Sequence, residues 1–315
     1  MTTRRRLRLP LLVAGFVGLH AGLVGEGPSV PAPAAPGLRV VSWNLRNFPS
    51  KPGEPGEHDV SRLRQRLDEL DPQVLALQEI LDPRALPPLR PGWRWHASVQ
   101  GGRHGPQHLV IGWDPAVVDV LEPREHTSLT MGGKVRPALS GYVRAHHGGP
   151  DFHLVVVHLK ATRNGHDLRQ QQWSRLVDAI TTRHATGPVD PDVLLVGDFN
   201  AAGGPRVTPA EERTALAAAL APVRLTPWIL VGGCTAYWDG PRRDSWWEPS
   251  QIDLVWSGDL HEIPNERRRA WPGTHCARHR CAPIEASDHY PEPDLHTISD
   301  HCPVVVDIPG PDDDP

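Results

Sequence analysis

The sequence has little cysteine, no internal repeat and no surplus of positive charge. Its 315 residues include only 4 Cys, against 35 Pro and 29 Gly. So many turn-forming residues favour short elements joined by turns and argue against a bundle of long helices. The formal net charge is -4, so the chain lacks the broad positive field typical of proteins that bind polyanions. A phosphate-bearing substrate would therefore need local arginine and histidine residues or a metal ion.

The first 36 residues have the pattern of a targeting segment. A basic stretch at residues 4–8 precedes an apolar stretch at residues 9–24, and residues 32–34 read Ala-Pro-Ala, which matches an A-x-A cleavage site. The apolar stretch is shorter than the roughly 20 residues that span a bilayer. We expect a signal peptide and a Pro/Ala-rich linker over residues 1–36, and a secreted or periplasmic protein without stable membrane insertion. An uncleaved anchor and a disordered tail are the alternatives.

The cysteine count is even, and export permits disulfide bonds. Four cysteines allow three pairings. We expect Cys276 to pair with Cys281, closing a small loop, and Cys234 to pair with Cys302, fastening a distant loop beside His301. A zinc site is the alternative, although the spacing of its ligands matches no common zinc motif. The ligands of that site would be His275, Cys276, His279 and Cys281.

Apolar runs of strand length recur along the chain, and helical patterns separate some of them. The strands are expected at residues 38–44, 74–79, 109–113, 117–121, 139–146, 152–160, 193–196, 251–256 and 303–308. Helical spacing of apolar residues predicts one helix that stops at residues 71–72 and a second over residues 167–184. A capping box at residues 208–211 predicts the start of a third. With a hairpin at residues 147–150, this series predicts an α/β fold with mixed sheets.

The stretch VLLVGDFN, residues 193–200, shows how such a strand ends. Its apolar run stops at Gly197, and Asp198 and Asn200 follow two positions apart. In extended chain their side chains would point the same way. A carboxylate and an amide that leave a rigid strand together can hold a water molecule, a metal ion or a phosphate oxygen. An ordinary Asp/Asn turn is the alternative, and the other strand ends decide between the two.

Polar side chains lie at or beside the ends of six of the expected strands. They are Asn44, Glu79, His158, Asp198 with Asn200, Asp253, and Asp300 with His301. Turn chemistry alone does not account for carboxylate, amide or imidazole groups at so many strand ends. Together these groups can bind a hard divalent cation through oxygen and keep two histidines as acid and base.

The same motifs occur in the order seen in the endonuclease/exonuclease/phosphatase superfamily, and the sequence resembles this deoxyribonuclease-I-like family over residues 37–309. The motifs are SWN (42–44), QE (78–79), HLK (158–160), GDFN (197–200), QIDLVW (251–256) and SDH (299–301). Each is weak alone, but their order makes the resemblance specific. It implies an α/β four-layer sandwich of two face-to-face mixed β-sheets flanked by helices, followed here by an acidic tail at residues 310–315.

The resemblance also implies Mg²⁺-dependent hydrolysis of phosphate esters, with Mn²⁺ or Ca²⁺ as alternative ions. Glu79 would be the main metal ligand, with Asn44 and Asp300 beside it. Asp198 and Asn200 would orient the attacking water and the phosphate. These roles follow from the match of each residue to a family motif.

By the same resemblance, the remaining roles fall to histidines and an arginine. His301 would be the base, with Asp253 holding its ring in the productive tautomer. His158 would bind the phosphate and protonate the leaving oxygen. Arg136 would bind phosphate through its guanidinium group. The chemistry would be in-line hydrolysis, with charge on the phosphoryl oxygens stabilised by donors and metal.

A second Ser-Asp-His sequence lies at residues 287–289, before the one at residues 299–301. We prefer the later copy because the apolar run PVVVDI follows it and supplies a terminal strand. The sequence YPEPD, which follows His289, cannot continue as a strand. The earlier copy is then a polar loop, which can still lie near the groove.

Substrate choice depends on loops, where a single sequence says least. Several basic residues outside the motifs would form a patch that tracks a nucleic-acid backbone, unless they are merely solvated. They are Arg103, His104, Arg267, Arg268, Arg269, Arg278 and Arg280. Trp246 and Trp247 would stack on bases or touch a membrane surface, unless they simply pack.

We therefore expect an exported, monomeric, Mg²⁺-dependent phosphodiesterase that acts on nucleic acid, as a deoxyribonuclease-like endonuclease of low sequence specificity. A phospholipid phosphodiesterase of the sphingomyelinase type, a phosphomonoesterase and an inactive phosphate-binding relative are the alternatives. The sequence shows no long hydrophobic hairpin of the sphingomyelinase kind, which disfavours the first alternative. All the expected polar positions are present, which disfavours the last.

Overall fold

The computed structural model describes residues 31, 37–50, 53, 56–103, 105–240, 244–260, 263–287 and 291–311. The expected signal peptide and linker lie outside the described residues, apart from Pro31. So do His104, Asp288, His289 and most of the expected acidic tail. Within the described ranges, no helix is long and apolar enough to cross a membrane.

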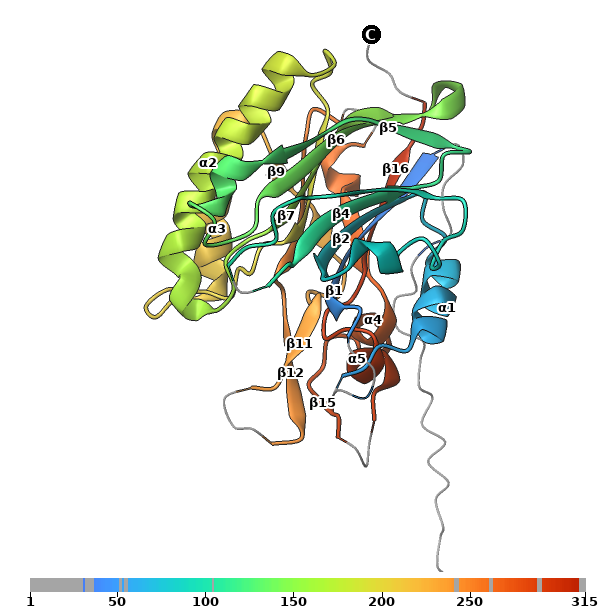
Figure 1. Ribbon diagram of the computed structural model, residues 1–315. Helices are drawn as coiled ribbons and strands as arrows, with labels where there is room; N and C mark the ends of the chain where they lie inside the picture. Colours follow the sequence, from blue (N-terminus) through green and yellow to red (C-terminus); the bar gives the residue numbers. More distant parts are fainter. Residues whose placement is uncertain are drawn as a thin grey trace, which may run out of the picture.

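Two large mixed sheets form the centre of the fold (Figure 1). The first contains β1 (Gly37–Phe48), β2 (Val74–Ile80), β3 (Arg94–Ala97), β4 (His108–Trp113), β10 (Ile229–Leu230), β14 (Arg269–Pro272) and β16 (Val304–Pro309). The second contains β5 (Val118–His126), β6 (Ala138–Ala145), β7 (Asp151–His158), β8 (Val193–Asp198), β9 (Thr226–Pro227) and β13 (Asp253–Gly258). Their strand orders are β10-β14-β16-β1-β2-β4-β3 and β5-β6-β7-β8-β13-β9. β1 runs parallel to β2 and antiparallel to β16, while β8 runs parallel to β7 and antiparallel to β13.

Helices cover the outer faces of both sheets, which gives four layers (Figure 1). α1 (Val60–Leu70) lies on the first sheet, where its buried leucines join a cluster with residues of β1 and β2. α2 (His166–Thr186) and α3 (Pro209–Leu220) cover the second sheet. Short 3-10 helices lie at Pro83–Ala85, Thr127–Thr130, His146–Gly148, Arg163–Gly165, Ala221–Val223 and Asn265–Arg267. The predicted α/β sandwich of two mixed sheets flanked by helices is confirmed.

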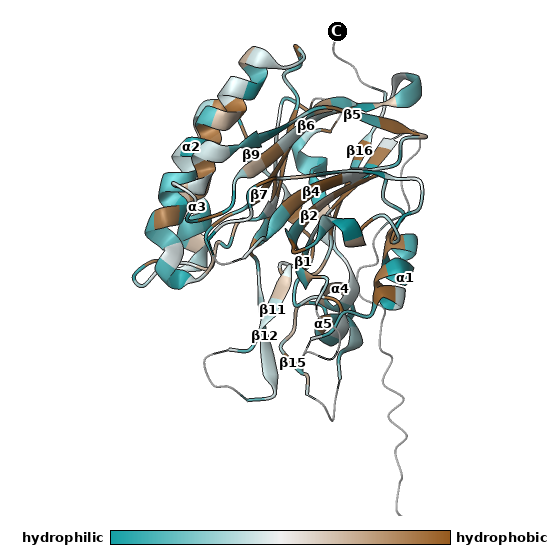
Figure 2. Cartoon of the chain, in the orientation of Figure 1, coloured by the Kyte–Doolittle hydropathy of each residue, from teal (hydrophilic) through white to brown (hydrophobic). Residues whose placement is uncertain are grey.

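Successive side chains of a strand contribute to two different hydrophobic clusters, one on each face of the sheet. In β1, Val40 belongs to the cluster that joins the two sheets, whereas Val41 belongs to the cluster beneath α1. Both side chains are fully buried. Successive side chains of a strand point to opposite faces, so one apolar strand supplies both layers. Figure 2 shows the hydrophobic residues concentrated in the strands of the two sheets.

The sequence patterns placed the long elements correctly. α1 ends at Leu70 because Asp71 caps it in the left-handed conformation (φ 47°). At the start of α3, Thr208 Oγ1 accepts from Glu211 N at 3.2 Å, and the reciprocal bond completes the predicted capping box. Each of the nine predicted strands overlaps an observed one, namely β1, β2, β4, β5, β6, β7, β8, β13 and β16, with bounds that differ by a few residues. The prediction missed short strands such as β9 and β10, because two residues cannot display a period.

A small sheet and two short helices extend one end of the sandwich (Figure 1). They are β11 (Ala236–Trp238), β12 (Trp246–Ser250), β15 (Ile284–Glu285), α4 (Thr274–His279) and α5 (Pro293–Thr297). Their core includes Tyr237, Ile284, Leu295 and the four cysteines. We refer to these elements together as the end subdomain.

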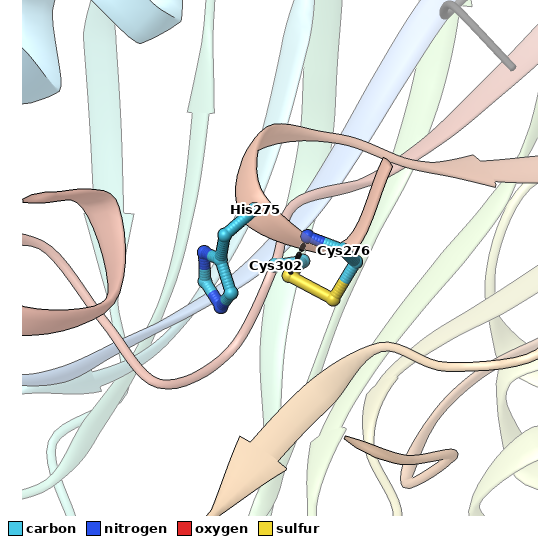
Figure 3. Close-up of side chains that lie close together, drawn as sticks. All are labelled: His275, Cys276 and Cys302. Carbon is cyan, nitrogen blue, oxygen red and sulfur yellow. Dashed lines mark hydrogen bonds between the residues drawn. A yellow bond between two sulfur atoms is a disulfide. The ribbon is translucent and has the colours of Figure 1, made fainter. Parts of the chain in front are cut away.

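The predicted disulfide pairing is wrong: Cys234 pairs with Cys281, and Cys276 pairs with Cys302. Cys276 lies in α4, with its side chain buried against Cys302 (Figure 3). Cys281 follows the helix in the left-handed conformation (φ 56°), and its sulfur is bonded to that of Cys234. Cys302 N donates to Thr235 O at 2.8 Å, so Cys302 is one position out of register with Cys234. The tertiary path of the chain decides the pairing, and spacing alone does not encode it.

The alternative zinc site is also wrong. Its two cysteines belong to different disulfides, so neither supplies a thiolate ligand. The ring of His279 is held by Glu292, with Nε2 and Oε2 2.6 Å apart. His275 is buried beside the Cys276–Cys302 disulfide (Figure 3).

Candidate active site

The register of the strands brings the predicted polar residues to one edge of the sandwich. Asn44 and Glu79 lie where the parallel pairing of β1 and β2 becomes irregular. In the other sheet, His158 pairs with Asp198, which in turn pairs with Asp253 across β7, β8 and β13. The two sheets therefore present these side chains to a common space. We call this region the catalytic edge.

Backbone conformation aims several of these side chains. Gly197 precedes Asp198 with φ 134°, and a Cβ there would lie 2.1 Å from Val157 O, so only glycine fits without a shift. Glu79 and Asn200 adopt φ values of 58° and 50°. Non-glycine residues in the left-handed region cost of order 1–3 kcal/mol each and cluster at functional sites.

The expectation that Asp198 and Asn200 point the same way is wrong. β8 ends at Asp198, and the left-handed conformation of Asn200 turns the chain at once. Asn200 N donates to Asp198 Oδ1 at 2.8 Å, while Asn200 Nδ2 donates to Leu159 O at 3.2 Å. Asn200 therefore ties the end of β8 to the end of β7.

Glu79, His158 and Asp198 form the centre of the site. His158 Nε2 lies 3.3 Å from Asp198 Oδ2 and 3.6 Å from Glu79 Oε1. Asn44 Nδ2 donates to the same two oxygens, at 3.1 Å and 3.3 Å. The other end of that amide, Asn44 Oδ1, accepts from Arg46 N at 2.9 Å. Because a backbone N–H can only donate, this bond fixes the amide nitrogen toward the carboxylates.

Burial governs the protonation of these groups. It raises the pKa of Glu79, and it raises the pKa of Asp198 to about 7. Burial, reinforced by the charge of Arg136, holds the pKa of His158 well below its ordinary value. His158 is therefore neutral at pH 7, and the nearby carboxylates favour the tautomer with hydrogen on Nε2. Its Nδ1 is buried without a hydrogen-bond partner among the described residues.

His301 and Asp253 form a second group beside the first. His301 Nδ1 lies 2.9 Å and 3.1 Å from the two oxygens of Asp253, and its Nε2 lies 3.9 Å from Asp198 Oδ2. Burial alone would lower the pKa of His301. The charges of Asp253, Asp198 and Asp300 outweigh burial and raise that pKa well above its ordinary value. His301 is therefore a cation at neutral pH.

Three residues to which the sequence assigned no individual role position this pair. Ser299 Oγ donates to Asn44 O at 2.7 Å and accepts from His301 N at 3.1 Å. Trp43 Nε1 donates to His301 O at 3.0 Å, and Thr235 Oγ1 accepts from Asp253 N at 2.9 Å. The structure thus brings the Ser-Asp-His sequence at residues 299–301 into the site, whereas two residues of the earlier copy lie outside the described ranges.

Arg136 reaches the catalytic edge, but its guanidinium group contacts the backbone. Nη2 donates to Leu159 O at 2.6 Å, and Nε donates to His158 O at 3.3 Å. Nη1 lies 3.4 Å from Gln107 Oε1. Its charge also acts on the carboxylates of the site. The arginine predicted to bind phosphate therefore also supports the strand end that carries His158.

The donor set suits a hard divalent cation. Donor atoms of Glu79, His158 and Asp198 all lie within 4.8 Å of one another. Mg²⁺ is typically bound through one or two carboxylates and completes its shell with water. Asp300 is close enough to add to the rise in the pKa of Glu79. Asn44 directs nitrogen, not oxygen, at these carboxylates, so its geometry suits hydrogen bonding to them.

A buried ion pair behind the site was not predicted from the sequence. Arg169 and Glu212 are fully buried, with Nε–Oε1 and Nη2–Oε2 distances of 2.7 Å and 3.0 Å. Arg169 also donates to the carbonyl oxygens of Lys160, Thr162 and Gly203 at 2.8, 2.6 and 2.7 Å. Glu212 Oε2 accepts from Gly203 N at 2.7 Å. The pair thus fastens the loops that follow β7 and β8.

The sequence held a usable signal for this pair. Arg169 shares a helical face with Trp173 and Leu176, which are buried in the main core. A charged residue on the apolar face of a helix predicts either that an oppositely charged partner is buried beside it or that this face is not buried at that point.

The predicted basic patch is not one surface. Arg268 is buried and donates to the carbonyl oxygens of Leu260 and Ile263 at 2.7 Å and 3.0 Å. Arg278 forms ion pairs with Glu292 and Asp294. These two arginines stabilise the fold and are not free to meet a phosphate backbone.

Two other members of the patch lie away from the site. Arg269 begins β14, whose far end, Pro272, pairs with Val304 at the start of β16. Arg269 and the preceding Arg267 therefore lie toward the other end of the sheet from His301. Arg103 and Arg280 are exposed.

The two tryptophans of β12 differ in their surroundings. Trp247 Nε1 donates to Ala286 O at 3.2 Å, and its ring packs against the core of the end subdomain. Trp246 is 47% exposed. Packing is therefore confirmed for Trp247, while Trp246 remains at the surface.

A two-sheet sandwich with this cluster of carboxylate, amide and imidazole groups at one edge defines the deoxyribonuclease-I-like class of phosphoric ester hydrolases. The chain belongs to the Endonuclease/Exonuclease/phosphatase family, whose model matches residues 41–301. Enzymes of this family generally depend on divalent metal ions, and the clustered donors are able to bind one. No curated protein sequence matches the chain.

Solved structures share the fold at low sequence identity. The catalytic domain of human nocturnin with bound sulfate is 17% identical, with a TM-score of 0.54 and coverage of 88% of this chain and 95% of that one. D. rerio TDP2 complexed with single strand DNA product is 16% identical, with a TM-score of 0.53 and coverage of 86% and 98%. A mannosyl-6-phosphatase of Bacteroides thetaiotaomicron is 18% identical, with a TM-score of 0.56 and coverage of 85% and 98%. These likenesses concern the fold alone.

Proposed function

We propose that the protein is an exported, Mg²⁺-dependent phosphodiesterase that cleaves nucleic acid as a deoxyribonuclease-like endonuclease of low sequence specificity. The observation that carries this proposal is the cluster of Glu79, His158 and Asp198, whose donor atoms lie within 4.8 Å of one another. His301 Nε2 lies 3.9 Å from the same aspartate. A phosphate at this edge would meet carboxylates, a neutral imidazole and a cationic imidazole together.

The pKa values support one assignment of the proton transfers. The pKa of Asp198, about 7, lets this carboxylate accept a proton from the attacking water near neutral pH. The raised pKa of His301 keeps its ring cationic, which suits it to stabilise charge on the phosphoryl oxygens. We therefore propose Asp198 as the base in place of His301, because a base must be unprotonated to act.

His158 would contact both the phosphate and the leaving oxygen. Its Nε2–H, now 3.3 Å from Asp198 Oδ2, would donate to a phosphate oxygen. The negative charge of that phosphate would raise the low pKa of His158. Protonated from solvent as the substrate binds, the ring would give this proton to the leaving oxygen as the phosphorus–oxygen bond breaks. Asn200 and Arg136 would keep the strand ends in place around it.

Glu79 and Asp300 would hold the Mg²⁺, and Asn44 would order the carboxylates by hydrogen bonding. When bound, the cation polarises a phosphoryl oxygen as a Lewis acid and stabilises the negative charge that develops there. Glu79 would hold the cation in its ionised form, so binding would oppose the burial that raises the pKa of this residue.

Several observations support export and a nucleic-acid substrate. All four cysteines are paired, which suits an oxidising compartment, and residues 1–36 have the pattern of a signal peptide. A relative in fold, D. rerio TDP2, was solved with a single strand DNA product. The described residues between β11 and β12 include Asp239 and Asp244, which would oppose insertion of that hairpin into a membrane. We also propose that the protein is a monomer.

Three classes of phosphate ester separate the proposed function from its alternatives. Purified protein would be incubated with plasmid DNA, sphingomyelin and a phosphoinositide, each with Mg²⁺ and with EDTA. We expect nicking and then linearisation of plasmid only in Mg²⁺. Intact plasmid beside a cleaved lipid would contradict the nuclease proposal. Absence of turnover on every substrate would favour a phosphate-binding protein without catalysis.

A further inference from the structure

A pocket of about 730 Å³ adjoins the catalytic edge. Two of its lining residues are adjacent in sequence to residues of the site: Ala201 follows Asn200, and Ile252 precedes Asp253. A third wall segment leads to Thr235, whose Oγ1 holds the backbone N–H of Asp253. A group bonded to a phosphate at the catalytic edge would therefore find this pocket beside it. Its volume lies within the range of about 300–1,000 Å³ typical of small-molecule sites.

The walls combine a planar aromatic ring, small residues and positive charge. Trp238 lines the pocket with 49% of its surface exposed. Arg163 and Arg213 also line it, and the described lining residues include no carboxylate. Arg163 is held in place, because its Nη1 and Nη2 donate to Ala202 O and Gly204 O at 3.4 Å and 2.5 Å. This chemistry suits a flat aromatic group that carries negative charge on its attached groups.

We propose that the pocket binds the nucleoside group attached to the scissile phosphate, with its base stacked on Trp238. This inference rests on the proposed phosphodiesterase function and narrows its substrate to nucleotide esters. Stacking on an aromatic ring accepts every base, because every base has a π face. The pocket would therefore strengthen binding of nucleic acid without selecting a sequence. Small residues that line the pocket, including Gly232 and Gly233, leave room for the base.

The same hairpin offers a matched control. Trp246 lies on β12, is 47% exposed and is not among the described residues that line the pocket. Trp238 pairs with Glu248, two residues from Trp246, so both tryptophans belong to the same three-stranded sheet. The substitutions Trp238→Ala and Trp246→Ala remove the same side chain at nearly equal exposure. Only the first removes the proposed stacking surface.

Two diesters with the same leaving group separate binding of the nucleoside from the chemistry. Thymidine 5′-(p-nitrophenyl phosphate) and methyl p-nitrophenyl phosphate would each lose p-nitrophenolate as water adds to phosphorus. In Trp238→Ala we expect KM for the thymidine ester to rise about 5- to 150-fold, the range of one lost stacking contact. The kinetics of the methyl ester should not change. Trp238→Phe should retain most of the affinity, and Trp246→Ala should behave as wild type.

Each other outcome overturns the inference. An equal rise in KM for both esters would mean that Trp238 supports the fold, and an unchanged KM would mean that the pocket is not used. An equal effect of Trp246→Ala would show that the integrity of the three-stranded sheet, and not the pocket, matters. Loss of binding to phosphatidylserine vesicles in Trp238→Ala, with KM unchanged, would assign the ring to a membrane. Failure of the wild type to hydrolyse either ester would instead overturn the proposed function on which the inference rests.

Discussion

Substitution of Arg169 by glutamine should destabilise the protein far more than an ordinary change on a helix. The change removes five hydrogen bonds, two to Glu212 and three to backbone carbonyl oxygens. It also leaves the Glu212 carboxylate fully buried without its cation. Removing one partner of a buried ion pair costs about 3–5 kcal/mol. His166 Nδ1 and Gly203 N still contact that carboxylate, at 3.0 Å and 2.7 Å, so we expect the lower end of this range.

Such a loss is large against the total stability of a domain, which is about 5–15 kcal/mol. Each kcal/mol lowers Tm by about 2–4 °C in domains of 150–250 residues, so Arg169→Gln should lower Tm by about 6–12 °C. Because the lost bonds fasten the loops after β7 and β8, kcat should also fall. Thermal unfolding followed by circular dichroism and urea titration would measure the change in stability.

Arg175→Gln is the matched control for this prediction. Arg175 lies in the same helix and contacts Asp178 at 3.6 Å, with side chains that are 54% and 62% exposed. Exposed ion pairs contribute about 0–1 kcal/mol, so the control should unfold almost as wild type does. If Arg169→Gln and Arg175→Gln lower Tm equally, the buried pair does not hold the loops as we infer.

The remaining predictions concern the metal, the proton transfers and the disulfides. Mg²⁺ should raise the Tm of the wild type but not of Glu79→Gln, and an equal rise in both would remove Glu79 as the main ligand. The rate should rise with pH as Asp198 ionises, with a pKa near 7, and should fall at alkaline pH as His301 loses its proton. Asp253→Asn lowers the pKa of His301 and should move the alkaline limb to lower pH; a shift of the acid limb instead would identify His301 as the base. The Cys276–Cys302 bond joins residues separated by 26 positions, so a Cys276→Ser and Cys302→Ser double variant should lose about 3.5 kcal/mol, and thiols that react with iodoacetamide in the native, unreduced protein would contradict the pairing.

The central strands and the strand-end residues were predictable because their signals are local. An apolar run of four to six residues that ends in polar residues, as in VLLVGDFN, predicts both the strand and the position where it ends. The pairing of His158 with Asp198 then follows from the register of neighbouring strands. The order of the motifs supplied what local patterns lack, namely that these strands belong to one site.

Other features depend on contacts that no local pattern records. Cys276 and Cys281 are near neighbours in sequence, yet each is bonded to a cysteine far from it along the chain. Asn200 was expected beside Asp198 on an extended chain, but its left-handed backbone turns it toward Leu159. The wall of the pocket that carries Trp238 comes from β11, a strand of three residues. Such short elements take their place from the tertiary packing around them.

The most direct test of the catalytic edge is the rate at which wild type and His158→Ala nick supercoiled plasmid DNA in Mg²⁺. General acid–base groups contribute about 10²–10⁴-fold to a rate. His158 also lies within 3.6 Å of both central carboxylates. We therefore predict that the wild type nicks the plasmid and that the variant, with an unchanged Tm in EDTA, is at least about 100-fold slower. Equal rates for a well-folded His158→Ala, or a plasmid that the wild type leaves intact, would contradict the account.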